Sequence, residues 1–461
     1  MVSRLTPQDA TFHSLESSKN PVAIGSLAIL DNSNGALDYE TLLELVEERL
    51  FLVPRYRMKV REVPFGLGAP VWIDDRDFDV TYHVRRSALP KPGTREQLHD
   101  LVARLISRPF DTTRPLWEMF LVEAVAGNRV ALFIKTSAAL VDGTDALEIG
   151  HVILDTSSEH RDVAADLWLP ADEPSPVSLA VGALAHLVTR PVEGVAVWRR
   201  RIEEVGLVME SAVKALSGMV GVLGVPTSSA PTSPLNATTS RNRRVSMAST
   251  DLEDYRRVRA HSGGSINDVV LAVIAGALRS WLQSRGEPIT GSTTLRAVVP
   301  MSVYLDESGP QSTVTSFLID LPVGEPNPVI RLSHIAHATK AQGSLQLPVT
   351  ARTLVRLSGF APASMHAMSV RAAAGFSQRT FNLVITNAPG PQVPMYVGGS
   401  RMLEMYPVSP LLRNQALSIG ITSYDGRVYY GFNADRDAMA DVDVVTALIG
   451  ESMEELLDAC S

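Results

Sequence analysis

The side chains best placed for chemistry lie in residues 135–143, which read KTSAALVDG. A strand-like run at residues 130–135 leads into this segment and a helical pattern at 145–154 leads out, so we expect a tight loop. Ser137 could act as a nucleophile only with a base beside it, and the sequence indicates no such base. Asp142 and Gly143 are typical of a turn, because glycine accepts a positive φ.

A second polar pair, Asn267 and Asp268, stands at the start of an apolar helical run over residues 266–282. Two interpretations remain open. The first is implied only by the family resemblance given below: the asparagine amide could polarise a carbonyl group in the manner of an oxyanion hole. Alternatively, Ser265 or Asn267 caps the helix, which would explain the polar residues without any chemistry.

The histidines and the cysteine indicate no metal site. None of the ten histidines forms an HxH or HExxH pattern. His334 and His337 are three residues apart on an expected helix without a nearby carboxylate, so we interpret them as surface or core residues. Cys460 is the single cysteine, which excludes an internal disulfide and a cysteine-based metal site. No phosphate-binding or dinucleotide-binding glycine motif occurs, so we expect neither a metal nor a resident cofactor.

The overall charge argues against nucleic acid as a partner. The chain has 461 residues and a formal net charge of −8, whereas phosphate backbones require a basic surface. The start of the sequence lacks an apolar stretch of signal-peptide length, and no segment reaches the roughly 18 apolar residues of a spanning helix. We therefore expect a cytoplasmic protein, with peripheral contact to a membrane or lipid droplet left open.

The length and the pattern of elements predict two lobes. A chain of 461 residues is too long for one ordinary core. Each half mixes strands with helices, so the economical fold is a pair of α/β two-layer sandwiches meeting at a central cleft. We place the first lobe at residues 1–190, a helical crossover with a Pro/Ser/Thr-rich linker at 191–245, and the second lobe at 246–461.

Three segments outside the polar motifs also carry expectations. Residues 71–84 read as irregular, and residues 224–240 as a linker or exposed crossover. The long helical stretch at 198–223 begins with an arginine run and has an apolar face. It could lie on lipid or pack on the protein with a solvated charged face, and packing is the better-supported alternative.

Six segments in order resemble one enzyme family. The loop at 135–143 is similar to the one that carries HHxxxDG in the wax ester synthase/diacylglycerol acyltransferase family. This family shares its wider fold with chloramphenicol acetyltransferase and with peptide-synthetase condensation domains. The other matching segments are LTPQDA at 5–10, RPLWE at 114–118, INDVVLA at 266–272, TNAPGP at 386–391 and YPVSP at 406–410.

The resemblance implies transfer of an acyl group from a CoA thioester to an alcohol. In the family motif the second histidine takes the proton of the alcohol and returns it to the departing thiolate. Here the two histidine positions fall on Ser137 and Ala138, and alanine cannot titrate. General acid–base catalysis contributes about 10²–10⁴-fold, so the site should be impaired. Asp142 is then expected to orient the loop, and the Asn267–Asp268 pair to lie near the cleft.

Three functions remain open from the sequence. One is a working O-acyltransferase that makes triacylglycerol or wax ester from long-chain acyl-CoA, a co-substrate, through an unrecognised base; His261 is the least implausible substitute. The second is an inactive relative that binds acyl-CoA or neutral lipid. The third is a partner of an active relative. Residues 137 and 138 could also have been introduced to trap substrate.

Overall fold

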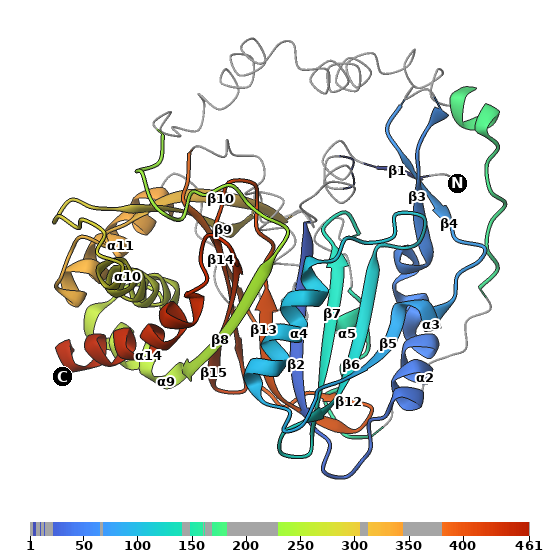
Figure 1. Ribbon diagram of the computed structural model, residues 1–461, viewed down its shortest axis with the longest axis horizontal. Helices are drawn as coiled ribbons and strands as arrows, with labels where there is room; N and C mark the ends of the chain where they lie inside the picture. The colour runs from blue at the N-terminus through green and yellow to red at the C-terminus, as the bar shows by residue number, and fades with distance from the viewer. Residues whose placement is uncertain are drawn as a thin grey trace.

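The computed structural model describes residues 3–5, 10, 13, 22–64, 68–140, 148–159, 161, 168–181, 229–304, 312–343 and 380–460. These residues form two α/β lobes, each built on a six-stranded sheet with helices packed against it (Figure 1). The predicted fold class, a pair of α/β sandwiches, is therefore confirmed.

The first lobe contains a mixed sheet of order β12-β13-β2-β7-β6-β5. All neighbouring strands are antiparallel except β5 and β6, which are parallel. A small sheet of order β1-β4-β3 lies beside it. The strands are β1 (Ser3–Arg4), β2 (Ala23–Asp31), β3 (Met58–Arg61), β4 (Val71–Asp74), β5 (Val84–Ala88), β6 (Trp117–Val125), β7 (Arg129–Ser137), β12 (Tyr396–Val397) and β13 (Ser400–Val408). The helices are α2 (Tyr39–Arg49), η1 (Leu50–Leu52), η2 (Pro54–Arg57), α3 (Val80–His83), α4 (Arg95–Ser107) and α5 (Ile149–Val152).

The second lobe contains a sheet of order β10-β9-β11-β14-β15-β8, with its helices gathered on one side (Figure 1). Helix α10 packs against both α11 and α14, and its residues form much of this lobe's apolar core. The strands are β8 (Arg243–Asp251), β9 (Leu295–Tyr304), β10 (Ser312–Leu321), β11 (Leu383–Pro389), β14 (Leu417–Tyr424) and β15 (Arg427–Asp435). The helices are α9 (Leu252–Ser262), α10 (Ile266–Ser284), α11 (Pro328–Gly343) and α14 (Val442–Ala459).

Strand β13 joins the two lobes, because it belongs to the second half of the sequence but pairs antiparallel with β2 of the first lobe. Where it passes β14 and β15, Gly420 and Gly431 stand opposite each other in register. A Cβ atom on Gly431 would lie 1.7 Å from the carbonyl oxygen of Pro407, far closer than any non-bonded contact of a Cβ atom. These glycines therefore permit β13 to cross β14 and β15 closely. Because β13 lies in the sheet of the first lobe, no single position in the sequence separates the strands of one sheet from those of the other.

The hairpin that leads to the predicted loop follows from local sequence. Strands β6 and β7 are joined by a turn in which Gly127 has φ 83° and Asn128 has φ 54°. Glycine and asparagine tolerate this left-handed backbone better than other residues, which explains why the turn forms here. The hairpin brings the end of β7, at Ser137, beside the start of β6, at Trp117.

Two segments differ from the sequence expectations. Residues 71–84 are not irregular, since they contain β4 and α3; the side chain of Asp79 caps α3 by accepting from Thr81 N at 2.9 Å. Within the Pro/Ser/Thr-rich segment, Leu235 is fully buried and its carbonyl accepts from Ala416 N at 2.8 Å. Asn236 Nδ2 also donates to Phe381 O at 3.1 Å, so apolar burial and hydrogen bonds together hold this part of the segment against the second lobe. The stretch at 198–223 lies outside the described residues.

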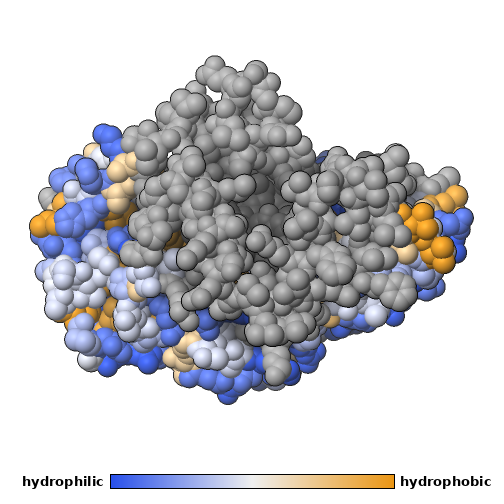
Figure 2. Space-filling model, turned by 90° about the horizontal axis from the view of Figure 1, so that it is seen from above, coloured by the Kyte–Doolittle hydropathy of each residue, from blue (hydrophilic) through white to orange (hydrophobic). Residues whose placement is uncertain are grey.

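The described surface is mixed in character. On the face seen in Figure 2, hydrophobic residues form small separate groups among hydrophilic ones. Of the described helices, none alone is long and apolar enough to cross a membrane. Helices α9 and α10 satisfy that test together, but they are bent by 103° at the break between them. Most of α10 is buried in the second lobe, which accounts for its apolar composition.

Candidate functional site

Ser137 ends β7 and closes a local turn. Its backbone N–H donates to Leu116 O at 2.9 Å, and its carbonyl accepts from Leu140 N at 3.0 Å. Its hydroxyl oxygen accepts from Ala139 N at 3.2 Å. The side chain is fully buried, and its hydroxyl is engaged in shaping the turn.

Ala138 occupies the position at which the family motif would place its base. The residue is fully buried and belongs to the apolar core of the first lobe, together with Ala139 and Leu140. The methyl group adds packing at this point and no titratable function. Asp142 and Gly143, predicted to support the loop, lie outside the described residues.

The Asn267–Asp268 motif separates into two structural roles. Ser265 is the cap of α10, and its hydroxyl accepts from Asp268 N at 3.2 Å while the Asp268 carboxylate accepts from Ser265 N at 2.8 Å. The other carboxylate oxygen accepts from Thr339 Oγ1 at 2.6 Å, which ties α10 to α11. Asp268 therefore completes a capping box and links two helices, so the capping interpretation accounts for this residue.

Asn267 points to a different partner. Its side-chain oxygen accepts from Asn387 Nδ2 at 3.0 Å, so the start of α10 is linked to the end of β11. A Cβ atom on the nearby Gly390 would lie 2.3 Å from Ser423 O, so the turn after β11 requires glycine. The structure thus brings together two motifs that are 120 residues apart in sequence. They belong to the second lobe, whereas Ser137 and Ala138 belong to the first.

The RPLW segment packs the first lobe around a histidine. The Trp117 side chain is fully buried and donates from Nε1 to Tyr56 O at 2.8 Å. Its ring stacks on His83 with centroids 4.6 Å apart, and the guanidinium of Arg114 lies 4.0 Å from the Tyr82 ring centroid. Burial lowers the pKa of His83 to about 4, so this imidazole is neutral at physiological pH. These contacts show that the segment packs the first lobe.

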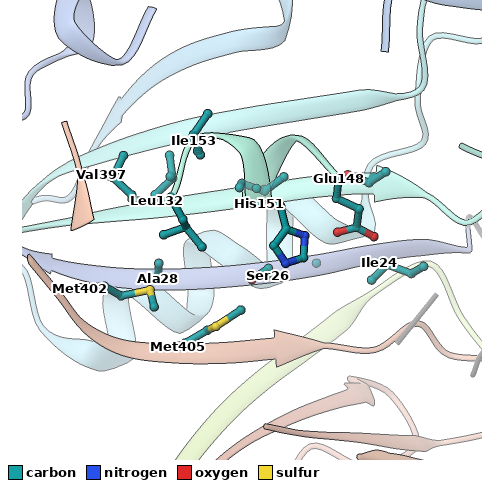
Figure 3. Close-up of a pocket in the computed structure, with 15 residues that line it drawn as sticks. Ile24, Ser26, Ala28, Leu132, Glu148, His151, Ile153, Val397, Met402 and Met405 are labelled. Atoms are coloured by element: carbon teal, nitrogen blue, oxygen red, sulfur yellow. The ribbon is translucent and has the colours of Figure 1, made fainter. Parts of the chain in front are cut away.

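A pocket in the first lobe contains two ionisable residues that sequence reasoning missed. It lies between the sheet face formed by β2 and β7, the strand β13, and the short helix α5 (Figure 3). Its empty volume is about 610 Å³, its open mouth included. Glu148 directly precedes α5 and His151 lies on α5, and both side chains point into the pocket. The available signal in the sequence was the spacing of three residues between Glu148 and His151, on the helix expected over residues 145–154.

The pocket changes the ionisation of both residues. Glu148 is 4% exposed, and burial raises its pKa to about 8. Burial lowers the pKa of His151 to about 4. Glu148 is therefore protonated and His151 neutral near pH 7, so the two residues add no net charge to the pocket. The remaining walls are mainly aliphatic, with Leu132, Met402 and Met405 among them.

Helix α5 is held in place by a buried ion pair. Arg49, at the end of α2, is fully buried and its Nη2 lies 2.8 Å from Asp155 Oδ2. The same guanidinium donates from Nη1 to Val152 O at 3.0 Å, at the end of α5. Because a buried charge requires satisfied partners, this contact orients the segment that carries Glu148 and His151.

The histidine considered as a substitute for the base, and the pair considered as metal ligands, lie outside this pocket. His261 is exposed in the last turn of α9, and His334 and His337 are exposed on α11. In the part of the chain that the structure describes, no group of three or more histidine, cysteine, aspartate or glutamate residues could hold a metal ion.

The family comparisons agree with these motifs. The model of the wax ester synthase/diacylglycerol acyltransferase catalytic domain matches residues 5–270, and that of the C-terminal domain matches residues 312–457. A Mycobacterium tuberculosis protein named as a probable diacylglycerol O-acyltransferase is 33% identical over 464 residues, covering 99% of this chain and 96% of its own. A second protein so named from that organism is 49% identical over 264 residues, covering 56% of this chain and 96% of its own.

Solved structures share the fold across the whole chain. The wax ester synthase/diacylglycerol acyltransferase from Marinobacter aquaeolei superposes with a TM-score of 0.68 at 24% identity, covering 99% of both chains. A condensation domain of the CDA synthetase superposes with a TM-score of 0.57 at 14% identity, covering 100% of this chain and 97% of its own. The motifs, the fold and the comparisons together show that this chain belongs to the wax ester synthase/diacylglycerol acyltransferase family of acyltransferases.

Proposed function

We propose that this chain has the scaffold of an acyl-CoA-dependent O-acyltransferase, with diacylglycerol or a long-chain alcohol as acceptor, and that its transfer step is impaired. The observation that carries the proposal is the buried methyl group of Ala138 at the position of the family's base. Membership of the family supports the reaction class, and the printed names of the mycobacterial relatives support the diacylglycerol acceptor.

The acyl-transfer reaction requires a general base, which this site lacks at position 138. When an alcohol oxygen attacks a thioester carbonyl, its proton must leave as the C–O bond forms, and the C–S bond then breaks to give an ester and a CoA thiol. A base near neutral pKa accepts that proton and delivers it to the sulfur. Ala138 can do neither, so we expect turnover about 10²–10⁴-fold below that of the same site with a histidine.

The acceptor and the acyl donor are both amphiphilic. We expect acyl-CoA to act as a co-substrate and not as a resident cofactor. A neutral-lipid acceptor would reach the protein from a membrane or lipid-droplet surface, which agrees with a protein that contacts lipid peripherally. The Asn267–Asn387 pair is our candidate for polarising the thioester carbonyl.

The test is transfer of a labelled long-chain acyl group from CoA to diacylglycerol and to hexadecanol. The unmodified chain is compared with Ala138→His and with Ala138→Gln, which adds similar volume at the same buried position but cannot titrate. A gain in Ala138→His alone supports a scaffold that lacks its base. Turnover in the unmodified chain that Ala138→His does not raise would show that another residue is the base.

The alternative is a relative that binds acyl-CoA or neutral lipid, or that assembles with an active acyltransferase. It is favoured if the unmodified chain and Ala138→His are both inactive while each remains folded. Equilibrium binding of labelled acyl-CoA to the same preparations then separates a lipid-binding protein from an interaction partner.

A further inference from the structure

Two polar atoms in the pocket beside α5 make no hydrogen bond within the fold. They are Glu148 Oε1 and His151 Nε2, which are both buried from solvent and have no hydrogen-bonding partner among the described residues. The Glu148 residue is itself only 4% exposed. A buried polar atom without a hydrogen bond has lost its hydration without compensation. Two such atoms in one pocket therefore indicate a ligand that can hydrogen-bond them.

The lining of the pocket has a polar end and an apolar end (Figure 3). Glu148 and His151 lie toward the same end, where β2 contributes Ser26 and Ile24. Thr136 of β7 also lines the pocket and is paired in register with Ile24, so its hydroxyl group belongs to this end. The opposite end is formed by Val397, Met402 and Met405. Hydrogen-bonding groups are therefore gathered at one end of the pocket.

The size of the enclosed space limits what the pocket can hold. Without the open mouth, the cavity between the walls has a volume of about 40 Å³. A buried water molecule needs about 10–15 Å³ of such space. The enclosed space therefore has room for about three water molecules, and it is too small for a long hydrocarbon chain.

The charge state of the polar groups excludes an ion as the ligand. Near pH 7 the Glu148 carboxyl is protonated and the His151 imidazole is neutral, because burial raises the pKa of the first to about 8 and lowers that of the second to about 4. An ion entering this space would lose its hydration without gaining a counter-charge. A water molecule both donates and accepts, so it suits a protonated carboxyl and a neutral imidazole.

We propose that the polar end of this pocket is an internal hydration site, in which about three water molecules hydrogen-bond Glu148 and His151 and connect them to the hydroxyl groups of Ser26 and Thr136. Buried waters of this kind each make about three hydrogen bonds and are part of the structure. The site joins α5, which follows the loop at Ala138, to the sheet face of β2 and β7. The inference goes beyond acyl transfer, because the waters hold this helix in place whether or not the loop supports turnover.

The first test is a crystal structure of the full-length chain at neutral pH, at a resolution that shows ordered water molecules. We expect solvent peaks within hydrogen-bonding distance, about 2.7–3.2 Å, of both Glu148 Oε1 and His151 Nε2. The apolar end of the pocket should hold no ordered water. A dry polar end, a direct hydrogen bond between the two side chains, or density for a hydrocarbon chain across the pocket would overturn the proposal.

Oxygen-17 magnetic relaxation dispersion tests the site in solution, because it counts water molecules that stay inside a protein for longer than the protein takes to tumble. A chain of 461 residues is expected to hold on the order of 17 buried waters. The double variant Glu148→Met with His151→Leu should lose about three of them. The double variant Glu148→Gln with His151→Gln retains hydrogen-bonding groups and should keep them.

Glu451→Met, at an exposed glutamate on α14, is the matched control and should hold as many waters as the unmodified chain. Equal counts in the unmodified chain and the folded variant with Met at 148 and Leu at 151 would refute the assignment. If that variant does not fold, the solvent peaks in the crystal structure of the unmodified chain decide the question alone.

Discussion

The buried carboxyl of Glu148 predicts an unusual dependence of stability on pH. Burial raises its pKa from 4.5 to about 8, so the native chain holds a proton there that the unfolded chain releases. The contribution of this residue to the free energy of unfolding is therefore complete below pH 4.5 and is lost as the pH rises to 8. Glu148→Gln keeps the shape of the protonated carboxyl but cannot ionise, so the variant should lack this loss.

The magnitude follows from the width of that window. It spans about 3.5 pH units, and each unit is worth about 1.4 kcal/mol. The loss is therefore about 3 kcal/mol at pH 7 and about 4 kcal/mol at pH 8, and it approaches about 5 kcal/mol above pH 8. His151 acts in the opposite direction, because its pKa is lowered to about 4. Its contribution is present above pH 6.5 and is lost as the pH falls to 4, but it is common to both proteins and cancels in their difference.

Thermal unfolding of both proteins between pH 4.5 and pH 8.5 measures the effect. The two melting temperatures should coincide near pH 4.5, and Glu148→Gln should melt a few degrees higher at pH 8. Glu451→Gln, at an exposed glutamate on α14, is the matched control and should follow the unmodified chain. Parallel curves for the unmodified chain and Glu148→Gln would show that Glu148 is ionised in the folded protein and would refute the reasoning.

Two further predictions concern the scaffold. Arg49→Met removes the buried partner of the Asp155 carboxylate and leaves only the exposed Arg161, whose Nε lies 3.5 Å from Asp155 Oδ1. The free energy of unfolding should therefore fall by about 3 kcal/mol, the lower end for a broken buried pair, in a denaturant titration; a loss below about 1 kcal/mol would contradict a buried pair. Gly431→Ala places a methyl group against Pro407 O and should prevent stable docking of the lobes, seen as earlier unfolding by calorimetry. Gly450→Ala, which meets open space on α14, should instead be neutral or stabilise by up to about 1 kcal/mol.

The features that sequence predicted well depend on local hydrogen bonds and spacing. The strand predicted over residues 130–135 forms as β7, and its hairpin with β6 turns at Gly127 and Asn128, which accept a left-handed backbone. Helix α10 starts at Ile266 because Ser265 and Asp268 satisfy each other within four residues. The absence of a titratable group at Ala138 is a matter of residue identity, and no fold can change it.

The features that sequence did not predict depend on distant elements. The place of β13 in the first lobe's sheet comes from pairing with β2, more than 350 residues away, and no local pattern encodes that partner. Asn267 and Asn387 meet only because α10 and β11 pack together.

Glu148 and His151 show most clearly what the sequence determines and what the tertiary structure decides. Sequence determined that a carboxyl and an imidazole stand three residues apart after the loop, but an ionisable side chain has its ordinary pKa until it is taken out of water. Strands β2, β7 and β13 cover these residues, so their burial depends on the tertiary structure. Desolvation by strands distant in sequence therefore decided the charge of both side chains.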